Sequence, residues 1–595
     1  MIVIAIGMVG CFQYDDVVGY DGPREPPPPP PTYSVIYDLG SATSGLPPID
    51  DTAYRFGEMA IVRGNSGELA LEGHVFAGWQ EQADSALIYA ADSTLVVDKA
   101  DVTLVPRWLP DSTPSHNLRY AANGATSGVL PAEPQLKRAA EAVALAINSG
   151  RLARENYAFA GWNTAPDGSG TYYLPSITIA MADQQLTLYA QWISATVIRP
   201  TDGGEDDRFG GSVAIDGNHA IVGAIGSASF FERVAQNQWS ERSTIPAPAY
   251  PGMLGDSDRS FGSRVAIDGD YAVVRSRYYR NEARDRQGAI YILQRSPSGD
   301  WAITTHVVAP EPYEHSRFAD SVAIDGAYII AGDFNADLVA NAAGVAYIYH
   351  RDSAGLWNNA FRLLPSSIQP TASFGNSVSI DGDYAIVGAD GERVDGRNPR
   401  GAVYVFRRNG VNTWTQEARL VHIDAHHRLF GHSVTIHQTT AVVGDPWSGL
   451  RGVTFGSATS FRRDSTGAWT ADDDLLVPAT GRRGSLGTTV AANDERIIVM
   501  GSVTPLDRSS GVAAMYVFER STDGNSKLRA RVIIEGAGDS WFNAPSVSID
   551  GNRVIVGAPA DAKRECVPGP RTYLSFSVHQ PALLSIEGTC RAWAG

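Results

Sequence analysis

The sequence is poor in cysteine and in positive charge. Its 595 residues include three cysteines, which allow at most one disulfide bond. Lysine and arginine together number 48 against 65 acidic residues, which gives a formal net charge of −17. Binding to nucleic acid requires clustered lysine or arginine to neutralise phosphates, so this composition argues against DNA or RNA as a partner. The surplus of acidic residues instead favours solubility.

The familiar catalytic motifs are also absent. The sequence contains no phosphate-binding P-loop, no HExxH zinc motif and no nucleophile elbow. Five histidines gather between residues 422 and 437, but they fall in a strand, a loop and the next strand. Zinc ligands converge on one point, which this pattern does not predict. Carboxylates are plentiful, yet no pair is distinguished as a glycosidase acid and nucleophile. We therefore expect no catalytic residue, no metal and no cofactor.

What the sequence does contain is a unit repeated seven times. In residues 373–391, SFGNSVSIDGDYAIVGADG, two runs of alternating apolar residues flank an Asp-Gly pair. This pattern predicts a β-hairpin, because a type I′ turn needs the positive φ that Asp tolerates and Gly adopts freely. The first residue of the motif recurs at spacings of 52, 57 and then four times 56 residues. These positions are Phe209, Phe261, Phe318, Phe374, Phe430, Leu486 and Phe542.

Each unit contains two further strands. The third is centred on an aromatic residue such as Tyr404, and the fourth opens with a tryptophan such as Trp414 in most units. Seven units of four antiparallel strands predict an all-β fold, a seven-bladed β-propeller over residues 195–595. The last unit has no tryptophan-led fourth strand, whereas residues 196–200 form an unpaired strand before the first unit. We expect this segment to complete the last blade and so close the ring.

The units resemble FG-GAP repeats of the bacterial type, which are relatives of the seven-bladed propeller of integrin α subunits. The Phe-Gly pair stands, for example, at residues 374–375, and the GAD end of the same unit at residues 388–390. Integrin blades often place a calcium loop between their first two strands, and calcium requires about six to eight oxygen ligands. Here the same place holds only a tight turn, so we expect its aspartates to form turns and not to bind calcium. These are Asp216, Asp268, Asp325, Asp381 and Asp550.

Two copies of another sequence precede the propeller, at an offset of 83 or 84 residues. The second copy, residues 115–194, contains FAGWN, DGSGTYY and LTLYAQW and resembles the Listeria-Bacteroides repeat, or internalin B-repeat. The first copy, residues 33–110, is degenerate. The resemblance implies two small β-rich modules that serve as a stalk or as adhesive units.

Within these modules the aromatic residues are expected to form the core of a small sheet instead of a binding patch, since aromatic side chains supply most of the burial in a small domain. They are Phe76, Trp79, Phe159 and Trp162. Residues 134–150 have a helical composition, but their position in the repeat predicts that part of the segment is strand.

The first eleven residues, MIVIAIGMVGC, form an apolar run that is too short to span a bilayer but suits a signal peptide. MVGC resembles the lipobox of bacterial lipoproteins, which implies lipidation of Cys11. The alternative is an apolar N-terminus with an incidental cysteine. Residues 12–32 are rich in proline and predict a semi-rigid spacer. In an oxidising compartment Cys566 and Cys590 either pair or remain free thiols.

In such a propeller the loops after the second and fourth strands share one face, where binding residues concentrate. These loops are long and varied here, and aromatic residues are enriched at binding hot spots. The candidate residues of this face are Tyr278, Tyr279, Asp333, Asp390 and Trp447.

Together these features predict a non-enzymatic, exported bacterial lipoprotein, anchored at the outer membrane or cell surface by its lipid alone. Its propeller would bind a protein or glycan ligand on a cell or matrix surface, for adhesion or for interactions within the envelope. One alternative is a propeller enzyme that acts on polysaccharide, with its carboxylates in the central funnel. Another is a purely architectural envelope protein.

Overall fold

In the computed structural model, every regular element of the described residues is a β-strand. Among these residues no helix is long and apolar enough to cross a membrane. The structure describes residues 32–55, 59–97, 101–131, 135–198, 200–201, 208–235, 238–249, 258–279, 287–311, 318–394, 399–422, 429–450, 453–454, 456–475, 481–505, 511–520, 526–534, 546–557 and 573–577.

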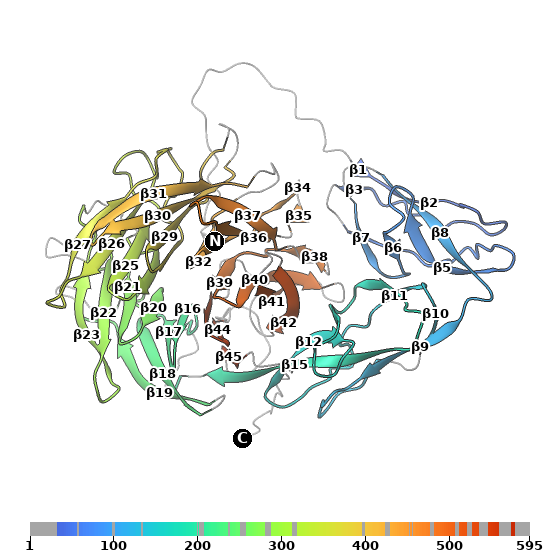
Figure 1. Ribbon diagram of the computed structural model, residues 1–595, viewed down its shortest axis with the longest axis horizontal. Helices are drawn as coiled ribbons and strands as arrows, with labels where there is room; N and C mark the ends of the chain where they lie inside the picture. The colour runs from blue at the N-terminus through green and yellow to red at the C-terminus, as the bar shows by residue number, and fades with distance from the viewer. Residues whose placement is uncertain are drawn as a thin grey trace, which may run out of the picture.

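Seven sheets follow one another in a ring (Figure 1). The first three blades consist of β16 (Ser212–Asp216), β17 (His219–Ala224), β18 (Ser227–Ala235) and β19 (Gln238–Pro246); β20 (Val265–Asp268), β21 (Tyr271–Ser276), β22 (Ala289–Arg295) and β23 (Trp301–Val307); and β24 (Ser321–Asp325), β25 (Tyr328–Asp333), β26 (Val345–Arg351) and β27 (Trp357–Leu363). Blades four and five consist of β28 (Val378–Asp381), β29 (Tyr384–Ala389), β30 (Ala402–Gly410) and β31 (Thr413–Leu420); and β32 (Ser433–His437), β33 (Thr440–Asp445), β36 (Ser457–Arg463) and β37 (Trp469–Asp474).

The sixth blade contains β39 (Thr489–Ala492), β40 (Arg496–Pro505), β41 (Val512–Arg520) and β42 (Ser526–Ile534), with β38 (Gly481–Gly484) added beside β40. The seventh contains β43 (Ser546–Asp550), β44 (Arg553–Gly557), β45 (Tyr573–Ser577) and β15 (Leu186–Ile198). A short hairpin of β34 (Gly449–Leu450) and β35 (Val453–Thr454) extends the fifth blade. The first strand of each blade contacts that of the next, and β43 contacts β16, so the ring is closed. The all-β, seven-bladed fold is confirmed.

The last blade is completed by a strand from the beginning of the chain. β15 pairs antiparallel with β45, from Ser194 opposite Ser577 to Ile198 opposite Tyr573. This confirms that the segment before the first repeat closes the ring, although the pairing begins two residues earlier than expected. The predicted domain boundary between residues 194 and 195 therefore lies inside a continuous strand.

The Phe-Gly motif joins neighbouring blades. Phe374 is fully buried, and the N–H of Gly375 donates a hydrogen bond to the carbonyl oxygen of Gly388, 2.8 Å away. Gly388 in turn faces the next blade, where a Cβ atom would lie 2.1 Å from the carbonyl oxygen of Gly431. Ser377 Oγ donates a hydrogen bond to that same oxygen at 2.7 Å. The motif residues recur because most junctions between blades repeat these close contacts.

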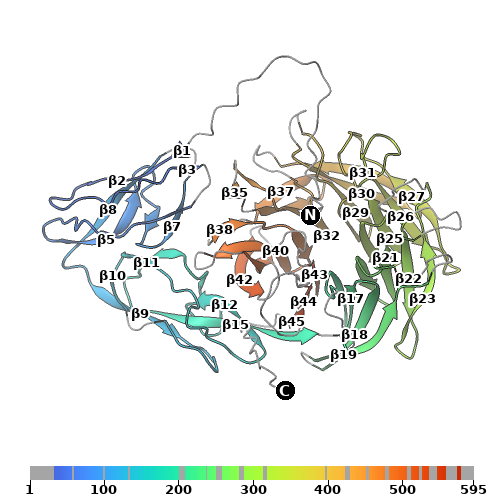
Figure 2. The same cartoon turned by 180° about the vertical axis from the view of Figure 1, so that it is seen from behind.

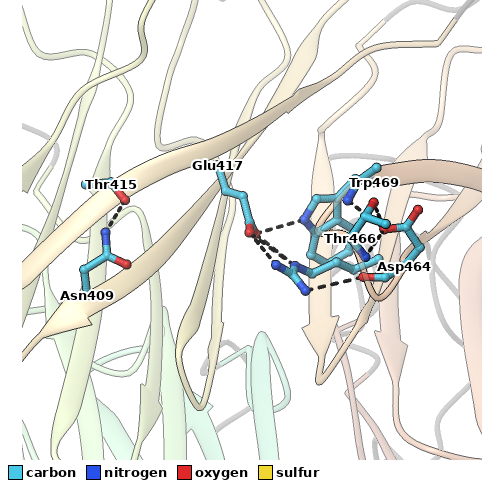
Figure 3. Close-up of polar contacts among 8 residues, drawn as sticks. Asn409, Thr415, Glu417, Asp464, Thr466 and Trp469 are labelled. Carbon is cyan, nitrogen blue, oxygen red and sulfur yellow. Dashed lines mark hydrogen bonds and ion pairs between the residues drawn. The ribbon is translucent and has the colours of Figure 1, made fainter.

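The tryptophans that open the fourth strands also lie at blade junctions. The ring of Trp469 packs edge-on against the ring of Tyr384 of the preceding blade, and the two ring centroids lie 6.1 Å apart. Arg463 Nη2 and Trp469 Nε1 both donate hydrogen bonds to the carboxylate of Glu417 on the preceding blade, at 2.7 and 3.2 Å (Figure 3). The same aromatic pair recurs at two other junctions, between Tyr271 and Trp357 and between Tyr328 and Trp414.

Two similar modules precede the propeller. The first has a four-stranded sheet of β2 (Val35–Tyr37), β8 (Val102–Pro110), β5 (His74–Glu81) and β6 (Ile88–Tyr89), with the strand pairs β1 (Thr32–Tyr33) and β3 (Tyr54–Arg55), and β4 (Met59–Ile61) and β7 (Thr94–Val96). The second has β10 (Gln135–Arg138), β9 (Ser115–Ala121), β15, β12 (Tyr157–Asn163) and β13 (Tyr172–Tyr173), with the pair β11 (Ala142–Ala144) and β14 (Thr178–Ala180). The segment with helical composition thus forms β10 and β11, as its repeat position predicted.

The two modules have equivalent aromatic cores. Trp79 and Trp162 are fully buried, and their Nε1 atoms donate hydrogen bonds to the carbonyl oxygens of Arg63 and Ala146, each at 2.8 Å. Phe76 and Phe159 pack against these tryptophans at the same centroid distance of 5.2 Å. The prediction that these aromatic residues form the module cores is confirmed.

The second module shares a hydrophobic core with the propeller. Ile193 belongs to the same buried cluster as Met500 of the sixth blade and Val554 of the seventh. The N–H of Arg531 in β42 donates a hydrogen bond to the hydroxyl of Tyr172 at 3.1 Å. Figures 1 and 2 show β15 running from the module into the ring, with β12 beside it. The second module is therefore a packed extension of blades six and seven.

Candidate functional site

The two faces of the propeller differ in character. We call the face with the turns between the first and second strands the turn face; it carries the Asp-Gly pairs at residues 216–217, 268–269, 325–326, 381–382 and 550–551. The opposite, loop face carries the connections from β21 to β22, β25 to β26, β29 to β30 and β33 to β36. Alternation of the antiparallel strands places every second connection on the same face.

The turn face repeats the same backbone-to-aspartate contact at five junctions between blades. The N–H of Gly326 donates a hydrogen bond to Asp268 Oδ2 of the preceding blade at 2.8 Å, and Gly382 donates to Asp325 Oδ2 at 2.7 Å. Each turn glycine is the first central residue of its two-residue turn and has a positive φ near 55°, whereas the residue after it does not, so these turns follow the type II′ pattern and the expected type I′ turn is wrong. The aspartates are thus turn residues, as predicted, and they also connect neighbouring blades. Burial raises the pKa of Asp268; the Gly326 hydrogen bond opposes this effect and neighbouring aspartates add to it.

The loop face presents an exposed tyrosine on the second blade. Tyr278 is 38% exposed, and the guanidinium of Arg277 lies over its ring, 5.8 Å from the centroid. Tyr279 is more enclosed, because its hydroxyl lies 3.0 Å from Nε2 of His306 and its ring packs near Tyr291. Of the two predicted tyrosines, Tyr278 is the more exposed.

The predicted acidic residues of the loop face occupy different environments. Asp390 Oδ2 lies 3.1 Å from Nδ1 of His432 on the next blade, and both side chains are partly exposed. Asp333 is only 1% exposed, so its carboxylate is enclosed by protein. Trp447 is half-buried, and its backbone N–H donates a hydrogen bond to Asp445 Oδ1 at 3.3 Å. The binding roles of these residues remain predictions.

The clustered histidines are separated in the structure. His432 lies at the start of β32 on the loop face, whereas His437 ends β32 on the turn face, where its Nε2 lies 3.1 Å from Asp494 Oδ1. The ring of His422 packs near Phe430 instead. Among the described residues no group of three or more His, Cys, Asp or Glu side chains could hold a metal ion. Cys11, Cys566 and Cys590 lie outside the described residues.

Two buried charged groups of the loop face were missed by the sequence analysis. Glu392 is fully buried, accepts a hydrogen bond from the Tyr404 hydroxyl at 2.7 Å and pairs with Arg419. Burial and the Glu392 carboxylate raise the pKa of Tyr404. Arg275 and Asp320 form an ion pair between the second and third blades. Arg275 stands where most units have glycine, so this departure from the repeat could have marked the position as unusual. Nothing comparable in the sequence distinguishes Glu392.

The chain was compared with known proteins. It matches the FG-GAP repeat family over residues 192–235, 357–406 and 414–459, and the Listeria-Bacteroides repeat domain over residues 116–191. Two relatives from Evansella cellulosilytica carry the names "Putative membrane protein" and "Putative Gly-rich membrane protein". The first is 35% identical over 123 residues, 21% of this chain and 18% of the relative; the second is 29% identical over 171 residues, 28% of this chain and 19% of the relative. The chain thus spans about a fifth of the length of these relatives.

Two solved structures were also found to be similar. The periplasmic gluconolactonase PpgL of Pseudomonas aeruginosa is 14% identical, with a TM-score of 0.37, and the match covers 71% of this chain and 99% of that one. YjhT is 11% identical, with a TM-score of 0.30, covering 55% of this chain and 98% of that one. The family matches, together with the blades described above, establish that the chain contains FG-GAP repeats and a Listeria-Bacteroides repeat domain.

Proposed function

We propose that this protein is a non-enzymatic component of the bacterial envelope whose propeller binds a protein or glycan ligand through its loop face. The contrast between the two faces carries the proposal. On the turn face the repeated aspartates are used in contacts between blades, while on the loop face the connections differ from blade to blade and include the exposed Tyr278. Variation on a rigid scaffold is typical of binding surfaces.

An envelope location is supported by the relatives that are named as membrane proteins and by the Listeria-Bacteroides repeat domain. The proposed anchor is a lipid on Cys11, followed by the proline-rich spacer. The packing of the second module against blades six and seven would fix the orientation of the loop face relative to the anchored arm.

The proposal is tested by screening the whole chain against glycans, matrix proteins and intact cells, with and without a chelator. Two loop-face variants, Tyr278→Ala and His432→Ala, are compared with Val411→Ser, a control on the turn face whose side chain is 64% exposed. We expect chelator-insensitive binding that the loop-face variants weaken and the control leaves unchanged. Binding that responds to none of the loop-face variants, or turnover of a polysaccharide, would count against the proposal.

A further inference from the structure

The junction between the second and third blades departs from the repeat. At the end of the second strand most blades have a glycine that packs against the backbone of the next blade; a Cβ atom on Gly332, for example, would lie 2.0 Å from the carbonyl oxygen of Gly375. In the second blade this position is Arg275, whose N–H donates a hydrogen bond to the carbonyl oxygen of Arg264 at 3.0 Å. The glycines at the equivalent position are Gly223, Gly332, Gly388, Gly444 and Gly557.

The facing residues of the third blade have changed as well. Its motif reads Phe318-Ala319-Asp320 in place of Phe-Gly, and Ala319 has a φ of 62°, in the left-handed region that an alanine rarely adopts. Asp320 pairs through its Oδ1 with Arg275 Nη2. A buried ion pair therefore replaces the glycine contact found at most other junctions, at the edge of the loop face.

Positive charge exceeds negative charge around this pair. Arg264 Nε donates a hydrogen bond to the backbone oxygen of Asp320 at 2.9 Å, and Arg277 follows Arg275 by two residues. Burial lowers the pKa of Arg275 to about 10; Asp320 opposes this effect, while the charges of Arg264 and Arg277 add to it. Three arginines, Arg264, Arg275 and Arg277, thus stand at this junction against two carboxylates, those of Asp320 and Asp258. Asp258, nearby in the chain, is buried and accepts hydrogen bonds from Ser260 and Ser276.

The buried arginine retains an unused donor. The Arg275 side chain is 4% exposed, and its Nε has no hydrogen-bond acceptor among the residues that the structure describes. Leaving a buried donor of a charged group unpaired costs free energy, and departures from the repeat that carry such a cost are expected at functional sites.

From these observations we infer that the loop face at this junction binds an acidic polysaccharide. A carboxylate or sulfate of the ligand lies against the guanidinium groups of Arg264 and Arg277, and a sugar ring stacks on Tyr278. Arginine favours such anions because its planar group donates paired hydrogen bonds. The exposed tyrosine supplies a flat, partly apolar surface beside the charges. This inference rests on the proposed function and names the class of ligand.

The test uses the whole chain and four polymers: polygalacturonate, which carries carboxylates, dextran sulfate, which carries sulfates, neutral dextran, and polyglutamate as an acidic peptide. Binding is measured by calorimetry at low and at high salt. We expect one or both anionic polysaccharides to bind, with weaker binding at high salt, and neutral dextran not to bind. Arg277→Glu should weaken binding by about tenfold or more, since a charge-assisted hydrogen bond contributes about that much. Tyr278→Ala should weaken it as well.

The matched control is Arg233→Glu, a charge reversal in the first blade near the turn face, which should leave binding unchanged although it alters the net charge equally. Equal losses in Arg277→Glu and Arg233→Glu would reveal only a non-specific charge effect and would overturn the inference. Stronger binding of polyglutamate than of either polysaccharide would do the same, in favour of an acidic peptide. If a neutral glycan or a protein binds the loop face and Arg277→Glu has no effect, the inference fails while the proposed function stands.

Discussion

At the level of single residues, the repeated motif encodes contacts between blades more than it encodes the hairpins themselves. The glycine at the end of the second strand permits a backbone approach that any side chain would block, and the turn aspartate accepts a hydrogen bond from the next blade. The glycine Gly388 meets Gly431, 43 residues later, and the aspartates meet glycines 57 or 58 residues later, which explains why the motif persists in units whose remaining residues differ.

The glycine contact leads to a prediction with a matched pair of substitutions. Gly388→Ala would place a Cβ atom 2.1 Å from a carbonyl oxygen, so we expect a loss of about 3 kcal/mol, at the upper end for overpacking. Gly382→Ala adds a Cβ atom in open space at a φ of 56°, so it should cost only about 1 kcal/mol, for the backbone alone. Thermal unfolding of both variants provides the measurement. Equal losses would show that the close approach between blades is relaxed in solution.

The ring of turn aspartates leads to a pH-dependent prediction. The pKa of Asp268 is raised in the folded state, first by burial, so its ionisation opposes folding above that pKa. This destabilisation is relieved as the pH falls through the folded pKa towards the ordinary value of 3.8. Asp268→Asn keeps an acceptor for Gly326 and removes the charge, so it should raise stability at neutral pH by about 0.5 kcal/mol, the scale of a partly exposed charge interaction.

The control for this effect is Asp268→Ala, which also removes the acceptor and should destabilise the protein by about 1 kcal/mol because the Gly326 N–H loses its partner. Unfolding midpoints of the three proteins between pH 3 and pH 8 separate charge from hydrogen bonding. If the advantage of Asp268→Asn grows as the pH falls, the assigned direction of the shift is wrong.

At the level of elements, the strands and the closure of the ring were predictable because both depend on local patterns that repeat. The alternation of apolar residues around each Asp-Gly pair specifies a hairpin, and the missing fourth strand of the last unit pointed to the unpaired segment before the first. The pairing of Arg275 with Asp320, and that of Glu392 with Arg419, could not be derived in this way. Each joins residues 27 to 45 positions apart through side-chain geometry that no repeat specifies.

β15 pairs with β12 in the module and with β45 in the propeller. We therefore expect the stability of the ring to depend on whether a truncated chain still contains β15. A chain that begins at Ser115 retains all of β15 and should associate no more than the full chain does. A chain that begins at Thr201 leaves β45 as an exposed edge, which promotes association between molecules. Light scattering of the two truncated proteins distinguishes these outcomes, and a monomeric, fully folded chain from Thr201 would show that β15 is dispensable.

At the level of the whole molecule, the second module is not an independent domain, because it shares a core and a strand with the propeller. It contributes Ile193 to a core shared with Met500 and Val554, and β15 passes from one sheet into the other without a break. The first module packs on the second, where Arg107 donates a hydrogen bond to the carbonyl oxygen of Ala140. The arm and the ring therefore form a continuous set of contacts, so that a load on the arm would reach the seventh blade along β15.

If the second module and the propeller are one cooperative unit, a change at their junction should shift the unfolding of both together. In Tyr172→Phe the N–H of Arg531 in β42 loses its acceptor, which should cost about 1 to 2 kcal/mol and lower the temperature of a single calorimetric transition. Tyr173→Phe, the adjacent substitution in the same short strand, removes a hydroxyl for which the structure gives no such contact across the junction, so its transition should stay close to that of the parent. A separate low-temperature transition for the module in Tyr172→Phe, with the propeller transition unchanged, would instead mean that the two parts fold independently.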